Sequence, residues 1–115
     1  MRPALTDAET VMKTLALAAL LGLSPLAARA DSPGSQAMMD AMMKMQMATQ
    51  TMTGDPDQDF VAMMIPHHQA AVDMARAELT YGKDPQLRAL AQDVIAAQER
   101  EIAAMKAWQQ AHRAP

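Results

Sequence analysis

Two Asp-Pro pairs constrain the fold of this chain more than any other feature of its sequence. Asp55-Pro56 and Asp84-Pro85 each combine a residue that caps a helix N-terminus with a proline suited to the first helical turn. Apolar residues after each pair recur with a period of 3.6, and the sequence contains no alternating strand pattern. Because the connections between the predicted helices are short, neighbouring helices have to run antiparallel. The sequence therefore predicts an all-α fold, an antiparallel three-helix bundle.

The predicted organisation has one small helical domain. Its segments are a linker over residues 31–35, a bundle domain over 36–112 with helices over 36–53, 56–81 and 85–112, and a tail over 113–115. Pro66 lies inside the second helix, where its ring removes one backbone hydrogen bond and should kink the axis. This kink is either a tolerated bend or a way to widen the space beside His67.

The first 30 residues, 1–30, are predicted to be a secretory signal peptide. An apolar run over residues 14–28 follows Lys13 and ends in a small-x-small cleavage pattern. The mixed charges before Met12 suit such a signal poorly, which makes Met12 an alternative translation start. The run is shorter than the roughly 20 residues of a membrane span, and a proline interrupts it. We expect export to the periplasm, cleavage after Ala30 and no membrane insertion after cleavage.

Charge and cysteine content limit the classes of function. The chain left after cleavage has seven basic and eleven acidic residues, a net charge of −4, and the sequence has one Trp, one Tyr and one Phe. Nucleic-acid binding needs a basic surface and aromatic platforms, so the composition argues against it. The sequence contains no cysteine, although small secreted domains usually depend on disulfides. Stability must then come from helix packing, oligomerisation or bound metal.

Methionine is the most unusual component, since thirteen methionines accompany three histidines. Thioether and imidazole groups form a soft ligand set that suits Cu(I) better than zinc, calcium or magnesium. Methionine is also a common core filler, so its positions matter. At about 100° per residue, the first predicted helix has two methionine stripes, one of Met38, Met42, Met45 and Met52 and one of Met39, Met43 and Met47. The first stripe fits a core, whereas the second borders a charged residue and is harder to explain by packing.

His67 is the better candidate ligand of two adjacent histidines. Methionines precede it by three and four residues and follow it by seven, whereas His68 has aliphatic neighbours typical of a packed core residue. Antiparallel helices pair residues whose numbers have a nearly constant sum, about 165 for the second and third helices and about 109 for the first and second. This register gathers one layer of the bundle: Met42, Met45, Met64, His67, Gln98 and Glu101.

We therefore predict a copper site in this layer. Its candidate ligands are His67, Met64, Met63, Met42 and Met45, with His68 and Met74 as further candidates. The polar groups expected around them are Gln98, Glu101 and Asp59. Either Gln98 or Glu101 would accept a hydrogen bond from the second imidazole nitrogen of His67 and fix its tautomer. Additional weak sites are predicted at Met39, Met43, Met47 and Met105.

The segment DQDFVAMMIPHHQAAVDMA, residues 57–75, and the later run over residues 84–108 resemble the signature of a known family. It is the CopM-like, domain-of-unknown-function family of exported bacterial proteins, and the resemblance covers nearly all of residues 55–109. It implies a ferritin-like helical bundle, periplasmic location and copper binding linked to copper tolerance. The matching positions are Asp57, Asp59, Met63, Met64, His67, His68, Met74, Gln98, Glu101, Met105 and Trp108. This chain carries one copy of the motif, so either three helices suffice or two chains associate to complete the bundle.

The expected function is binding of Cu(I), as a periplasmic buffer or delivery protein, without enzymatic chemistry. Its expected partners are the metal ion, a second copy in a homodimer and a copper-trafficking protein. A di-metal carboxylate enzyme on the same fold would need Glu-x-x-His pairs, and neither His67 nor His68 has a Glu three residues before it. The third alternative is structural, with methionines as adaptable packing, as a partner-binding groove or as an oxidant sink.

Overall fold

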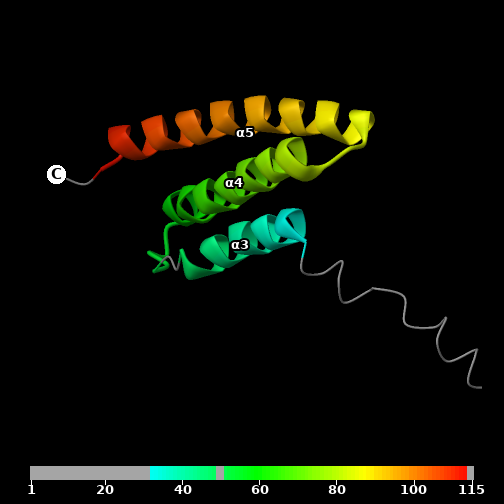
Figure 1. Ribbon diagram of the computed structural model, residues 1–115. Helices are drawn as coiled ribbons and strands as arrows, with labels where there is room; N and C mark the ends of the chain where they lie inside the picture. Colours follow the sequence, from blue (N-terminus) through cyan, green and yellow to red (C-terminus); the bar gives the residue numbers. More distant parts are fainter. Residues whose placement is uncertain (1–31, 49–50, 114–115) are drawn as a thin grey trace, which may run out of the picture. The chain divides into compact units, whose positions relative to one another are not determined.

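The computed structural model of this chain describes residues 32–48 and 51–113. It contains three α-helices, α3 (Pro33–Met47), α4 (Pro56–Tyr81) and α5 (Pro85–Ala111), shown in Figure 1. Within these two ranges there is no strand, and the predicted all-α class is confirmed for this part of the chain. The predicted signal peptide and its cleavage site lie outside the described residues. Among the described helices, none is long and apolar enough to cross a membrane.

All three helices begin in the same way, with a capping side chain followed by proline. The side chains of Ser32, Asp55 and Asp84 each accept a hydrogen bond from a backbone N–H of the first turn. The start of α4 and α5 therefore coincides with the predicted start. Helix α3 begins at Pro33, inside the segment that the sequence analysis assigned to a linker, because Ser32 supplies the same cap as the two aspartates.

Helix α3 ends at Met47, earlier than the predicted end at Thr53, and the C-cap residue Ala48 has already left the helical conformation, with φ −74° and ψ 58°. The buried carboxylate of Asp59 accepts hydrogen bonds from the backbone N–H of Thr53 at 2.7 Å, from its Oγ1 at 2.9 Å and from the N–H of Gly54 at 3.2 Å. Gly54 has a φ of 85°, in the left-handed region that glycine tolerates. These bonds make residues 51–54 a loop that leads into α4.

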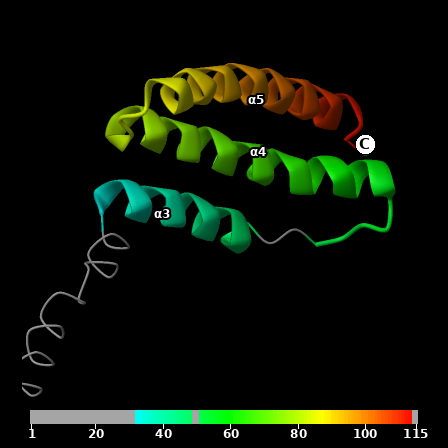
Figure 2. The same ribbon diagram turned by 90° about the vertical axis from the view of Figure 1, so that its right-hand side faces the viewer.

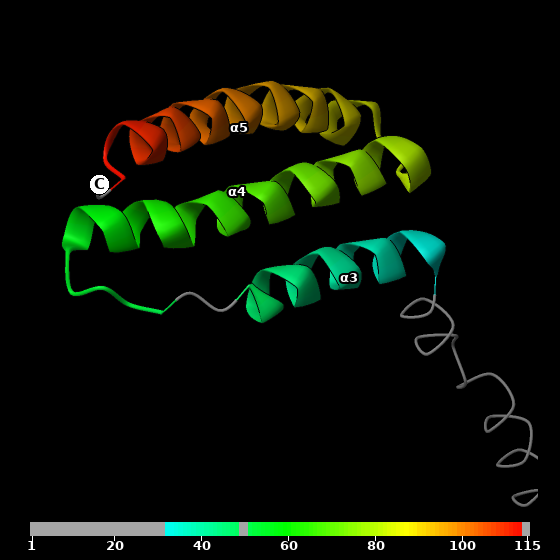
Figure 3. The same cartoon turned by 90° about the vertical axis from the view of Figure 1, so that its left-hand side faces the viewer.

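Helix α4 contacts both other helices, and within the described residues α3 and α5 do not contact each other. Figures 2 and 3 show α4 between them. Near the start of α4, Gln58 donates to the carbonyl oxygen of His112 at 3.4 Å. Near its end, Arg88 donates to the carbonyl oxygens of Leu79 at 2.6 Å and Gly82 at 3.1 Å. Helix α4 continues through Pro66 without interruption.

The buried core consists mainly of small side chains. Five of the eight buried apolar residues are alanines, and the set is Ala41, Val61, Ala70, Val72, Ala75, Ala77, Ala91 and Ile102. Small residues allow helix axes to approach closely, and Gly34 lies so close to Tyr81 that a Cβ there would stand 2.8 Å from the tyrosine Cβ. The large apolar side chains, methionines above all, are consequently left at the surface, where they are available for binding.

Candidate metal centre

An open cavity of about 320 Å³ lies where α3, the loop and the first half of α4 meet. Its lining residues are Met45, Ala48, Met52, Met63, Pro66 and His67. Three of these residues are methionines, whose side chains carry a thioether, one carries an imidazole, and none carries a carboxylate. His67 is exposed and Met63 is 54% exposed, so solutes can reach these donors from solvent. The structure thus brings two predicted ligands, Met45 and Met63, to the same cavity as His67.

Two other predicted ligands, Met42 and Met64, do not line this cavity. Met42 is 41% exposed on α3, and Met64 is half-buried on α4. Met74 lines a separate cavity of about 300 Å³ between α4 and α5, and Met105 lines a third of about 390 Å³. The predicted weak sites of α3 lie at the surface, where Met39 is 59%, Met43 52% and Met47 77% exposed. The structure therefore gathers a different subset of methionines from the layer that the register rule predicts.

Met52 is the cavity residue that the sequence analysis assigned to the core. It lies in the loop after α3 and is 59% exposed, because the chain has already left the helix. The sequence does contain a signal for this. Met52 stands between two threonines and is followed by Gly54, a run of low helix propensity. Placing Met52 in a loop rather than a helix changes its direction and brings its thioether to the cavity of His67.

The adjacent His68 has a different environment from His67. Its ring is buried, with 6% of the residue exposed, and its Nε2 lies 2.5 Å from Oε2 of Glu101. The planes of the two imidazoles are tilted by 60°, with 5.9 Å between ring centroids. Successive residues of a helix point about 100° apart, so His68 faces α5 and His67 does not. Glu101 was expected to serve His67 and in the structure pairs with His68.

Two buried polar atoms near this pair have no hydrogen-bond partner among the described residues, Nδ1 of His68 and Oε1 of Gln98. Gln98 was the other residue expected to bind the imidazole of His67, and no hydrogen bond joins these two side chains in the described part. The register of α5 explains the difference. A constant sum of about 165 would place His68 opposite residue 97 of α5. In the structure His68 meets Glu101, about one helical turn further along α5.

Asp59 acts on the cavity through the loop. The backbone N–H of Thr53 donates to its carboxylate and lowers the pKa of Asp59 below its ordinary value of 3.8, since the bond favours the charged form. Burial raises this pKa, and the side-chain hydroxyl of Thr53 and the N–H of Gly54 lower it further. The ionised carboxylate thereby fixes residues 53 and 54, which immediately follow Met52. Asp59 is thus placed to position a thioether rather than to orient the histidine.

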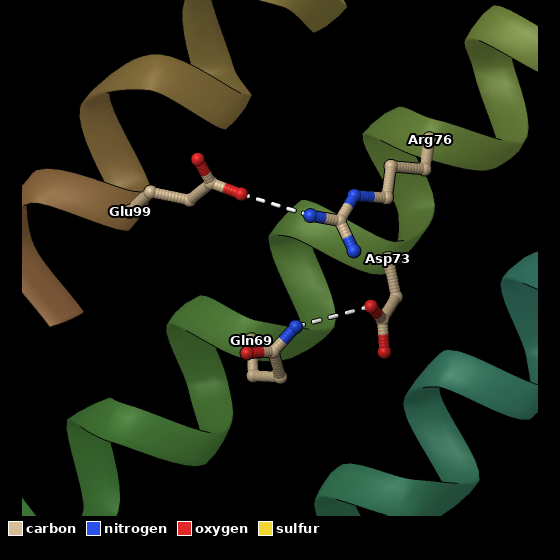
Figure 4. A network of polar contacts seen from close by, with 4 residues as sticks. All are labelled: Gln69, Asp73, Arg76 and Glu99. Carbon is tan, nitrogen blue, oxygen red and sulfur yellow. Dashed lines mark hydrogen bonds and ion pairs between the residues drawn. The ribbon is translucent and has the colours of Figure 1, made fainter.

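The charged side chains of Asp73 and Arg76 on α4 lie away from the cavity. Arg76 donates to Glu99 of α5 at 2.8 Å, and Gln69 donates to Asp73 at 3.1 Å, as Figure 4 shows. At about 100° per residue, these α4 positions are on the side of the helix opposite His67. In the part of the chain that the structure describes, no three His, Cys, Asp or Glu side chains lie close enough to hold a metal ion. The donor groups that line the cavity are the thioethers of three methionines and the imidazole of His67.

Three helices, a buried histidine paired with a glutamate, and an open methionine–histidine cavity define a small all-helical domain with a soft donor set. Residues 7–109 match the family described as Domain of unknown function (DUF305), and the chain belongs to this family. The predicted membership of a domain-of-unknown-function family is thereby confirmed. "Uncharacterized protein L153" of Acanthamoeba polyphaga mimivirus is similar to the chain, with 39% identity over 46 residues. That alignment covers 40% of this chain and only 30% of the viral protein.

Proposed function

We propose that this protein is a CopM-like member of the family that binds Cu(I) and buffers or delivers it in the periplasm as part of copper tolerance. The observation that carries the proposal is the cavity in which the imidazole of His67 meets the thioethers of Met45, Met52 and Met63. Soft donors of this kind favour Cu(I), whereas calcium and magnesium require oxygen ligands and structural zinc sites use thiolates and imidazoles.

The donor set also favours binding over catalysis. No carboxylate or hydroxyl lines the cavity, so a bound ion would have no neighbouring acid or base. Thioethers carry no proton, so protons would compete with the metal only at the imidazole of His67. Exposure of Met52 and Met63 would let the ion enter and leave without unfolding the domain. The exposed methionines of α3 would offer further weak contacts along the path of exchange.

The fold that we propose for this function is an antiparallel three-helix bundle of the ferritin-like class. Hydrogen bonds support the antiparallel course, since Gln58 at the start of α4 reaches His112 after α5, and Arg88 at the start of α5 reaches Leu79 near the end of α4. In such a bundle, His67 and Met63 stand on a long rigid helix. The ligand from α3 and the ligand from the loop can then approach or withdraw, which suits a carrier that has to release its ion.

The test is an anaerobic Cu(I) titration against a competing chelator. The double variant Met45→Leu with Met63→Leu removes one cavity thioether from α3 and one from α4. Its matched control, Met42→Leu with Met64→Leu, removes one thioether from each helix outside the cavity. We expect the first variant to bind Cu(I) at least about tenfold more weakly, since even partners outside the ligand set typically change affinity by this much.

The control should bind like the unmodified protein, and His67→Ala should weaken binding as much as the cavity variant. Equal losses in the two double variants would contradict the cavity assignment, and undetectable Cu(I) binding by the unmodified protein would overturn the function. Leucine preserves the apolar volume at each position, so both variants should keep their helices, which circular dichroism would verify.

A further inference from the structure

Helix α4 has two faces that neither α3 nor α5 covers, and they differ in chemistry. One carries Gln69, Asp73 and Arg76, whose polar contacts are visible in Figure 4. The other face is an apolar stripe at helical spacing, consisting of Phe60, Met64, His67, Ala71 and Met74. Phe60 and His67 are exposed, and the other three residues are only half-buried. Within the described chain, no fourth helix packs on this stripe.

The apolar stripe continues onto α5, and the two helices form a furrow with a cavity at each end. At one end Phe60 of α4 and Trp108 of α5 line the cavity of about 390 Å³. At the other end Met74 of α4 lines the cavity of about 300 Å³ together with Leu87 and Leu90 of α5. We call this surface the α4–α5 face; its residues are the α4 stripe together with Leu87, Leu90, Val94, Met105 and Trp108.

The amount of apolar surface on this face is at the upper end of what a monomer exposes. Phe60 is 59%, Leu87 52% and Leu90 56% exposed. Taking on the order of 100 Å² for each of these and about half that for the partly buried members, the face presents roughly 600 Å². The largest apolar patches on monomers are about 300–600 Å², and each partner of a stable complex buries about 800 Å². A core built mainly of alanine leaves these large side chains outside, where only another molecule can bury them.

We propose that the α4–α5 face binds a second copy of this chain, which forms a two-fold dimer. In such a dimer the same face meets itself in reverse direction. A two-fold axis near Ala71, about midway along the α4–α5 face, would set the Phe60 end of one copy against the Leu90 end of the other. Each end carries bulky side chains beside a cavity, so projections of one copy can enter the hollows of the other.

Three carboxylates lie along this face. Asp57 and Glu78 line the two end cavities, where water can still screen them. Glu101 lies between Val94 and Trp108 and pairs with His68 of the same copy.

This dimer does not depend on copper binding, and a failed titration would leave it standing. The test uses sedimentation equilibrium of the purified protein from micromolar to several hundred micromolar concentration. Leu90→Glu puts a charge on the α4–α5 face, and the matched control Ala96→Glu puts the same charge on an exposed position of α5 that points away from it. We expect the unmodified protein and the control to be dimers. Leu90→Glu should weaken the dimer at least about thirtyfold, the size of a strong interface contact.

A second variant tests the position of the axis. The protein has no cysteine, so Ala71→Cys introduces a single thiol where the two copies should meet. Mild oxidation should give a disulfide-linked dimer with Ala71→Cys and not with Ala96→Cys, because bridged Cα atoms must come within about 7 Å. A monomer at every concentration would overturn the proposal and assign the face to another occupant. A dimer that tolerates Leu90→Glu and fails to link through position 71 would also overturn it.

Discussion

The pair of buried His68 and exposed Glu101 gives the most direct test of the packing of α5 on α4. Replacing Glu101 with alanine leaves Nε2 of a histidine that is 6% exposed without its acceptor, and Nδ1 of the same ring has no partner among the described residues. An unsatisfied buried polar group costs about 1–3 kcal/mol. The side chain of Glu101 is 60% exposed, so water can partly replace it. We therefore expect a loss of about 1–2 kcal/mol.

Glu99→Ala is the matched control, since Glu99 is on the same helix and also pairs with α4. Its bond to Arg76 joins side chains that are 51% and 58% exposed, and exposed ion pairs contribute about 0–1 kcal/mol. Both variants replace Glu with Ala in the interior of α5, so the gain in helix propensity is the same in each. The difference between the two variants therefore isolates the buried histidine.

Thermal unfolding followed by circular dichroism measures this difference. For a domain of this size, 1–2 kcal/mol lowers the melting midpoint by about 4–16 °C. Protein concentration has to be equal in all samples, because association would shift every midpoint. Glu101→Gln should recover part of the loss, since its carbonyl oxygen can still accept from the imidazole. If Glu101→Ala melts within error of Glu99→Ala, the buried pair does not hold α5 on α4.

Three further predictions concern the loop, α3 and the cavity. The ionised Asp59 stabilises the wild type above pH 3.8, and this stability is lost as the pH falls through the lowered pKa of Asp59. Asp59→Asn should therefore melt at a lower temperature than the wild type at pH 6, and the two melting midpoints should converge towards pH 2. A difference in midpoint that stays constant over this range would contradict the role of Asp59. Gly34→Ala should loosen α3 and weaken Cu(I) binding, since a Cβ would meet Tyr81 at 2.8 Å, and an unchanged chelator titration would show that α3 adapts. Ag(I), a soft ion without the redox chemistry of Cu(I), should protect Met45, Met52 and Met63 from peroxide and leave Met43 and Met47 unprotected, which peptide mass spectrometry can detect; uniform protection would mean that the ion binds along the whole of α3.

The sequence predicted the long helices well because their boundaries are local. Asp55 and Asp84, each followed by proline, fix the start of α4 and α5 through side-chain caps that need no tertiary contact. The conformation of the loop after α3 depends on the next helix, since Asp59 of α4 accepts hydrogen bonds from the N–H groups of Thr53 and Gly54. The threonines on either side of Met52 lower the helix propensity of this run, but they do not mark the residue at which the helix ends.

The helix register was harder to predict than the helix faces. A shift of one turn keeps the same side of α5 against α4, so the apolar pattern is nearly unchanged by it. The hydrogen bonds from Arg88 to the carbonyl oxygens of Leu79 and Gly82 fix the conformation of the connection between α4 and α5. A constant sum of residue numbers takes no account of that conformation. His68 consequently meets Glu101, and the face of His67 is free of both residues expected to bind it. The apolar periodicity of a sequence predicts which side of a helix packs against its neighbour. Which residues pair across two helices depends on the geometry of the connection between them.

The exposure of the methionines discriminates among the explanations for their number. Adaptable packing requires burial, yet Met39, Met43 and Met47 are all more than half exposed, and α3 buries only Ala41. An oxidant sink requires exposure alone and gives no reason for thioethers to share a cavity with an imidazole. Soft-metal binding accounts for both observations, because His67 needs neighbouring donors and the ion needs a path to reach them. Leucine at the same positions would provide equal apolar surface without a donor. Soft-metal binding, as we propose it, would explain methionine rather than leucine at Met45, Met52 and Met63, the positions that line the cavity of His67.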